Sequence, residues 1–204
     1  MRGPFGFAAH SAICSTARCS LTGIRTVLLA AGILSLQVAP EGLAQTPAAN
    51  EFQVEAVFLF NFTQFVIWPS TAFTDATDPF VICLLGEDRF GAYLDDTIRG
   101  ERIAQRSMVV KRYRRLDDID VCHILFISKS EGSKVSEILV RLQGRNVLSV
   151  SDADNFGRRG GMIRFVVEHN HVRLRVNLQA AKAAGLTISS KLLRVVDIVE
   201  TGKD

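Results

Sequence analysis

Two hydrophobic periodicities alternate along the chain and predict its secondary structure. Runs of consecutive or alternating apolar residues predict strands, and apolar residues three and four positions apart predict helices. The predicted strands are Phe80–Leu85, Ser107–Tyr113, His123–Ser128, Val147–Val150, Met162–Val167 and Val172–Val176. The predicted helices are Glu51–Val66, Asp88–Ile98, Glu131–Leu142, Leu178–Ala184 and Ser189–Val199.

The order of these elements predicts the fold class. Strands and helices alternate over much of the chain, which favours a single-domain mixed α/β fold with a mostly parallel β-sheet flanked by helices. The last two predicted strands are joined by a tight polar turn around residues 168–171. They should therefore form an antiparallel hairpin at one side of the sheet, followed by C-terminal helix.

The first predicted helix is rich in aromatic residues. Asn50 is expected to cap its N-terminus with Gln53 as the capping-box partner, and Trp68 with the proline after it would end the helix,. Phenylalanines at positions 58, 62 and 65 lie on one face,. We expect this stripe to lie in the core. The alternative is a small-molecule pocket near Phe62, Phe65 and Trp68.

Residues 1–44 have the layout of a secretory signal peptide. Two arginines precede an apolar stretch over residues 26–39, and a Gly-Leu-Ala sequence at 42–44 offers small residues for cleavage,. The stretch is shorter than the roughly 20 apolar residues that a transmembrane helix needs. We therefore expect export and one mature domain over residues 45–204, with an uncleaved anchor as the alternative.

The charge balance argues against a nucleic-acid partner. The full chain holds 24 Lys and Arg against 21 Asp and Glu. Three of these basic residues and one acidic residue lie in residues 1–44, which leaves 21 basic against 20 acidic residues in the predicted mature domain. Proteins that bind nucleic acids usually carry a clear basic excess or patch.

Cysteine positions indicate a disulfide. Cys14 and Cys19 belong to the predicted signal peptide, so Cys83 and Cys122 remain in the mature domain. Two cysteines in an oxidising compartment favour a bridge, and it is geometrically accessible if their predicted strands are neighbours. The alternative is a pair of buried thiols.

No strong catalytic motif appears in the chain. Ser149 or Ser151, Asp152 and His169 supply the residue types of a hydrolase triad, yet no G-x-S-x-G sequence surrounds either serine,. His169 and His171 resemble a metal pair, but they occupy a predicted hairpin turn, where polar residues are expected, and further ligands would have to come from elsewhere,. We expect neither a cofactor nor a metal.

The segment Ser151–Gly161 is too irregular to be a simple connector, and it is the best candidate for a specific surface. Phe156 lies among glycines and arginines, and an exposed apolar ring with a polar rim suggests a protein contact,. The alternative is that this ring tucks under the loop as a plug. The candidate contact residues are Phe156, Arg158, Arg159, Glu168 and Leu174.

Several segments together resemble the YfiR-like family of periplasmic proteins. They combine N-F…F-x-x-W-P, C-x-L-G, S-D…F…GGMI and N-L…A…L-x-I-S-S-x-L-L, in that order and at the family's spacing, over almost the whole mature domain. The segments are Glu55–Pro69, Val81–Gly91, Cys122–Ser128, Ser149–Val166 and Val176–Val199.

The resemblance implies a periplasmic repressor, not an enzyme. The best-known member binds the periplasmic sensor portion of an inner-membrane diguanylate cyclase, and an outer-membrane OmpA-like lipoprotein can sequester it, which raises cyclic di-GMP and promotes biofilm. The resemblance also implies an α/β domain that tends to form homodimers. Cys83 and Cys122 match a family disulfide. A second family disulfide has no counterpart here, so Gly157, Gly160 and Gly161 should shape the loop instead.

Overall fold

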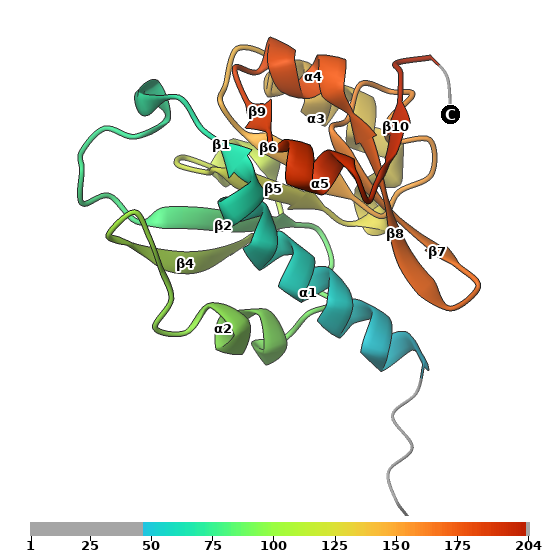
Figure 1. Cartoon of the computed structure of the whole chain (residues 1–204), viewed down its shortest axis with the longest axis horizontal. Helices are drawn as coiled ribbons and strands as arrows, with labels where there is room; N and C mark the ends of the chain where they lie inside the picture. Colours follow the sequence, from blue (N-terminus) through green and yellow to red (C-terminus); the bar gives the residue numbers. More distant parts are fainter. Residues whose placement is uncertain (1–46, 203–204) are drawn as a thin grey trace, which may run out of the picture. The chain divides into compact units, whose positions relative to one another are not determined.

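The computed structural model describes residues 47–202, and the predicted signal peptide over residues 1–44 lies outside the described residues. The described chain forms an eight-stranded sheet and a two-stranded sheet (Figure 1). The large sheet contains β2 (Phe80–Leu85), β3 (Arg102–Ile103), β4 (Arg106–Tyr113), β5 (Ile124–Ile127), β6 (Leu148–Ser151), β7 (Ile163–Glu168), β8 (His171–Asn177) and β10 (Asp197–Val199). The small sheet pairs β1 (Val66–Ile67) with β9 (Thr187–Ile188). The helices are α1 (Pro47–Phe65), α2 (Ala92–Ile98), α3 (Val135–Arg141), α4 (Leu178–Ala183) and α5 (Ser190–Leu193), with 3-10 turns η1 (Ser70–Ala72), η2 (Leu116–Asp118) and η3 (Lys129–Lys134).

The strand order of the large sheet is β10-β8-β7-β6-β5-β2-β4-β3. The central strands β4, β2, β5, β6 and β7 are parallel, whereas β8 is antiparallel to β7 and β3 to β4. The predicted mixed, mostly parallel sheet with a C-terminal antiparallel hairpin is therefore confirmed. The chain steps outward from β2 to β4, then returns to β5 and proceeds the other way to β6. This reversal between β2 and β5 is a topological switch point.

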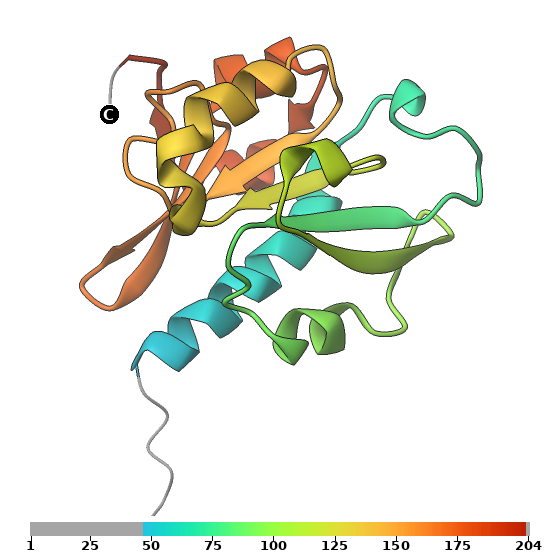
Figure 2. The ribbon, with the colours of Figure 1, turned by 180° about the vertical axis from the view of Figure 1, so that it is seen from behind.

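Both faces of the sheet are covered by helices. The side chains of Phe80, Ile82 and Leu84 in β2 share one core with α1, α2 and α5, which lie in front of the sheet in Figure 1. The intervening residues of β2 share a second core with α3, which lies in front in Figure 2. All six residues of β2 are buried. This explains the unbroken apolar run that predicted the strand.

The predicted disulfide joins Cys83 to Cys122. Cys83 lies in β2 and Cys122 comes two residues before β5, the strand that pairs with β2. The Cα atoms of the two cysteines are 6.0 Å apart, within the range usual for a disulfide,. The bridge lies in the core on the α3 face, so it braces two central strands.

Two predicted helix starts are wrong. α1 begins at Pro47, so Asn50 lies inside the helix and does not cap it. Proline suits the first helical position because its φ angle is already helical and it has no N–H to satisfy. α2 begins at Ala92, because the Asp88 side chain instead accepts hydrogen bonds from the backbone N–H groups of Phe90 (2.8 Å) and Gly91 (3.1 Å) in a turn.

The last predicted helix is also wrong in most of its length. α5 ends at Leu193, and the chain then forms the edge strand β10, which pairs with β8 in parallel. The segment after Leu193 is rich in β-branched residues, which favour strands,. This segment pairs with the free edge of β8. The spacing of apolar residues within the segment cannot show that such an edge is present. Likewise, the first part of the helix predicted from Glu131 is the 3-10 turn η3.

Candidate functional site

The loop between β6 and β7 carries the predicted contact residues, and its aromatic ring points inward. Phe156 is 0% exposed and belongs to the core that α3 covers. The N–H of Gly161 donates to the carbonyl of Phe156 (2.9 Å), and a Cβ atom at Gly161 would collide with the ring. The prediction that the Phe156 ring is exposed is therefore wrong. The alternative, that the ring tucks under the loop as a plug, is confirmed. Leu174 of β8 is also buried, at 4% exposure, so it does not extend a surface patch.

Arg159 ties the loop to the start of α3. Its Nε donates to Ser136 Oγ (3.0 Å) and its Nη1 donates to the carbonyl of Gly132 (2.6 Å). Arg158 next to it has an exposed side chain, and its carbonyl accepts a hydrogen bond from the N–H of Gly202 (3.2 Å). The loop is thus fixed at its two arginines.

Glu168 lies apart from these arginines. It ends β7, five residues beyond Ile163, so roughly 16 Å of strand separates it from the loop,. Its carboxylate pairs with Arg175 of β8 at 3.1 Å. The predicted contact residues therefore do not form one patch: two are buried, two lie at the loop, and one lies near the hairpin tip.

The residues considered above for a hydrolase triad or a metal pair have structural roles instead. Ser151 Oγ donates to the carbonyl of Ile127 (2.6 Å), and Ser149 Oγ accepts from the N–H of Met162 (3.1 Å). His169 and the asparagine after it have positive φ angles, as a tight hairpin turn requires,. Within residues 47–202 no group of three or more His, Cys, Asp or Glu side chains is arranged to hold a metal ion.

Asn177 holds the loop, the segment at Thr201 and α4 together, and sequence reasoning did not single it out. Its Oδ1 accepts from the N–H of Ala180 and caps α4 (3.0 Å). Its Nδ2 donates to the carbonyl of Gly157 (3.2 Å) and to Thr201 Oγ1 (2.9 Å). The only available signal was that an asparagine directly precedes an Ala-rich helical segment, as a cap does,.

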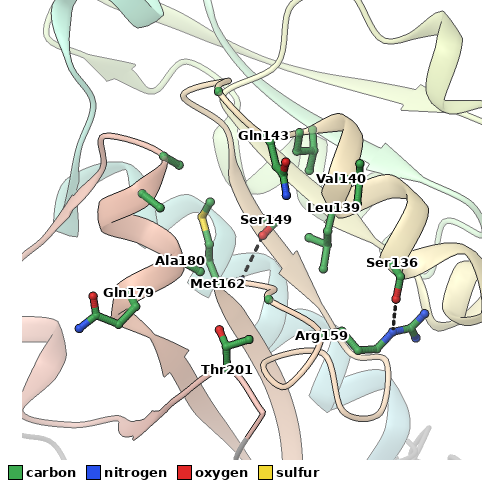
Figure 3. A pocket seen from close by; sticks show the side chains of 15 residues that line it. Ser136, Leu139, Val140, Gln143, Ser149, Arg159, Met162, Gln179, Ala180 and Thr201 are labelled. Carbon is green, nitrogen blue, oxygen red and sulfur yellow. Dashed lines mark hydrogen bonds between the residues drawn. The ribbon is translucent and has the colours of Figure 1, made fainter.

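A groove of about 540 Å³ opens between α3 and α4, and we call it the α3–α4 groove (Figure 3). α3 contributes Leu139 and Val140 to one wall, and the small side chain of Ala180 in α4 forms part of the other. Met162 lies at its floor, and Arg159 lies at the end nearest the loop. Val140 is 62% exposed and adds apolar surface at the groove. An open apolar groove with a polar rim fits an apolar side chain of a protein partner.

A second cavity, of about 820 Å³, lies where β2, β5 and β6 end, and we call it the carboxyl-end cleft. Arg89 from the loop after β2 forms an ion pair with Asp152 and covers the ring of Phe52 at 4.0 Å. Glu55 of α1 is 1% exposed, and its Oε2 lies 3.6 Å from Arg89 Nε. Burial raises the pKa of Glu55 to about 7, although the positive charge of Arg89 opposes this shift and nearby Glu51 adds to it.

The aromatic residues that suggested a small-molecule pocket are packed against other rings. Phe62 is fully buried and stacks with Phe165 at a centroid distance of 6.1 Å. Trp68 meets Phe80 edge to face at 4.9 Å, and its Nε1 donates to the carbonyl of His123 (3.2 Å). The expectation that this stripe lies in the core is thus confirmed for Phe62, and Trp68 pins the segment after α1 to the sheet.

His123 is a buried histidine with both ring nitrogens engaged. Its Nδ1 accepts from the N–H of Val81 (3.0 Å), so its Nε2 carries the proton and donates to the carbonyl of Ala72 (3.2 Å). The ring stacks between Phe73 and Phe80, at 4.5 and 4.8 Å. Burial lowers the pKa of His123. This side chain fastens the loop before β2 to the sheet.

Comparison with known protein families shows to which family the chain belongs. The model of the YfiR/HmsC-like family matches residues 52–196, which is nearly the whole described chain. The chain belongs to the YfiR/HmsC-like family. No curated protein matches the sequence significantly. Across residues 47–202 of this YfiR/HmsC-like protein, no helix has the length and apolar composition needed to cross a bilayer.

Proposed function

We propose that the protein is a non-enzymatic periplasmic regulator that binds the periplasmic sensor portion of an inner-membrane diguanylate cyclase and holds it inactive. Membership of the YfiR/HmsC-like family over residues 52–196 is the observation that carries this proposal. The roles of Ser149, Ser151 and His169 support it, because each takes part in a hydrogen bond or turn that the fold itself needs. Release of the cyclase would raise cyclic di-GMP and favour biofilm.

The α3–α4 groove is the surface we propose for docking this partner. It is apolar at its centre, and Val140 is exposed on its α3 wall. Arg159 at its loop end supplies charge that would orient an acidic or polar partner segment, and we propose the neighbouring, exposed Arg158 as a further contact,. Phe156 acts only indirectly, because it is buried and holds the loop in shape through its contacts with Gly161. Glu168 on the hairpin is a separate, second contact, and an outer-membrane OmpA-like lipoprotein is the second partner that we propose.

The test is a clean deletion of the gene, with cyclic di-GMP measured in cell extracts. Deletion should raise cyclic di-GMP, and the wild-type gene supplied in trans should restore the lower level. A Val140→Asp variant should fail to restore it, because a carboxylate in the groove would have to be desolvated against the partner. Val195→Asp is the matched control, since Val195 is 72% exposed and lies outside the groove.

The outcomes test the proposed cyclase regulation and the proposed docking surface separately. Unchanged cyclic di-GMP in the deletion strain would remove the cyclase as the target. Full restoration by Val140→Asp, with raised cyclic di-GMP in the deletion strain, would keep the function and move the docking surface elsewhere. Both variants should melt within about 2 °C of the wild type, because substitutions at exposed positions usually change stability by less than about 0.5 kcal/mol.

A further inference from the structure

The carboxyl-end cleft lies where α/β sheets usually bind small ligands. The loops after β2 and β5 leave the sheet at the topological switch point between these strands, and both contribute to the cleft,. β7 extends past the end of β6, because Ser151 at the end of β6 pairs with Arg164 near the start of β7. The remainder of β7 therefore forms a side wall, and α1 supplies the other wall with Phe52 and Glu55.

A buried donor and a buried acceptor face each other in this cleft without a hydrogen bond. Glu55 Oε2 and Arg89 Nε are 3.6 Å apart, which exceeds hydrogen-bond distance,. Neither atom has a hydrogen-bond partner within the described part of the chain. Buried polar atoms are rarely left in this condition, because each loses its hydrogen bonds to water. One group that both donates and accepts would satisfy the two atoms together, and a hydroxyl does both.

The other charges of the cleft balance in number, because Arg89, Lys129 and Arg164 lie among Asp152, Asp154 and Glu87. Arg89 pairs with Asp152, while Arg164 and Lys129 both pair with Asp154, at 2.6 and 3.4 Å. An ionic ligand would have to displace one of these partners. A neutral ligand would not, and the paired carboxylates and guanidinium groups offer it acceptors and donors side by side.

The backbone at the cleft is also occupied by the protein itself. The N–H of Lys129, which opens the turn after β5, donates to Asp152 Oδ1 (2.8 Å). The N–H of Glu87 after β2 donates to Ser130 Oγ (3.0 Å). These are positions where a phosphate would bind in many α/β proteins. Here a carboxylate and a hydroxyl of the chain already hold them, so the cleft does not favour a phosphate.

We infer that the carboxyl-end cleft binds a neutral polyhydroxylated molecule, a sugar or polyol, and that the side chains of Glu55 and Arg89, now 3.6 Å apart, separate to admit one of its hydroxyls. That hydroxyl donates to Glu55 Oε2 and accepts from Arg89 Nε. Phe52 lines the cleft beneath Arg89 and adds apolar surface to its wall. The cavity, at about 820 Å³, is within the size range of small-molecule sites,. This inference stands apart from the cyclase partner and from the α3–α4 groove.

The test uses the purified protein and three neutral probes, D-glucose, D-galactose and myo-inositol. Melting curves and titration calorimetry at millimolar concentrations should show saturable binding of at least one of them. Glu55→Leu should weaken that binding at least tenfold, because it removes the buried acceptor and leaves the cavity otherwise similar. Glu101→Gln is the matched control and should change the affinity less than twofold, since Glu101 is exposed and lies outside the cleft.

D-glucosamine and D-glucuronate serve as charged counterparts and should bind more weakly than D-glucose. Three results would overturn the inference: no binding of any neutral probe, equal binding by the Glu55→Leu protein, or equal binding of a charged counterpart. A melting curve of Glu55→Leu without ligand shows whether that variant is folded. If it is unfolded, Arg89→Met takes its place and should produce the same loss of binding.

Discussion

Gly161 lies so close to the ring of Phe156 that no side chain fits between them. The same two residues are joined by a hydrogen bond from the Gly161 N–H to the Phe156 carbonyl (2.9 Å). The loop between β6 and β7 therefore closes over its own aromatic ring. The double glycine that ends this loop is explained by packing for Gly161 and by a positive φ of 93° for Gly160.

Replacing Gly161 with alanine should destabilise the protein. The added methyl group must displace a buried ring, and overpacking of this kind typically costs about 1–3 kcal/mol. The free energy of unfolding from urea titration measures this. Gly132→Ala is the control, because no atom lies within 4 Å of a Cβ built there, and it should change stability by less than about 0.5 kcal/mol,. A Gly161→Ala protein as stable as the control would show that the ring has room to move.

The disulfide should contribute about 2–4 kcal/mol of stability, because it closes a long loop between two paired strands,. A Cys83→Ala, Cys122→Ala double variant should unfold at correspondingly lower urea concentration than the oxidised wild type. Reductant should lower the midpoint of the wild type and leave that of the double variant unchanged. If the oxidised and reduced wild type unfold alike, the bridge does not stabilise the fold.

The sequence predicted the central sheet well because the signal is local. A strand buried on both faces, such as β2, reads as an unbroken apolar run whatever its neighbours are,. The pairing of β10 with β8 was missed because it depends on an edge that only the assembled sheet provides. The same holds for Phe156: an aromatic ring among glycines suits either a plug or a contact, and the space beneath the loop decides between them.

The charged pair of the carboxyl-end cleft was missed for a similar reason. Glu55 and Arg89 come from α1 and from the loop after β2, and the fold alone brings them together. One local signal was present. Glu55 precedes Leu59 by four positions and Phe62 by seven, so it lies on the buried face of α1,. A carboxylate at such a position indicates a partner elsewhere in the chain, and the sequence does not say which.

His123 should make stability fall in acid. In the folded protein its Nδ1 accepts the N–H of Val81, and burial holds its pKa below the ordinary 6.5. The unfolded chain therefore takes up a proton first as the pH falls, so this contribution is complete above about pH 6.5 and is lost progressively below it. Arg106 lowers the pKa further, and Asp78 opposes it.

The comparison is between the wild type and His123→Asn, whose side-chain oxygen can accept the same N–H. Free energies of unfolding measured at pH 7.5, 6.5 and 5.5 should decline more steeply for the wild type. The absolute stability of the variant does not matter, because only the slope reports the titration. Parallel slopes would assign the acid sensitivity to other groups.

Glu55 should act in the opposite direction. Its folded pKa of about 7 lies above its ordinary value of 4.5, so the folded protein holds a proton that the unfolded chain has released. Its contribution is most favourable below pH 4.5 and is lost as the pH rises through about 7. A shift of this size corresponds to a change on the order of 3 kcal/mol. Replacing the residue with leucine removes the titration and keeps an apolar side chain on the buried face of α1.

The stability of Glu55→Leu relative to the wild type should therefore rise between pH 5 and pH 8, by up to about 3 kcal/mol. Urea titrations at these two pH values measure the difference, and Glu87→Gln, an exposed carboxylate at the same cleft, should show no such change. A bound hydroxyl between Glu55 and Arg89 would favour the ionised carboxylate and shrink the effect. A neutral sugar that binds the cleft should therefore reduce the pH dependence of the wild type and leave that of Glu55→Leu unaltered.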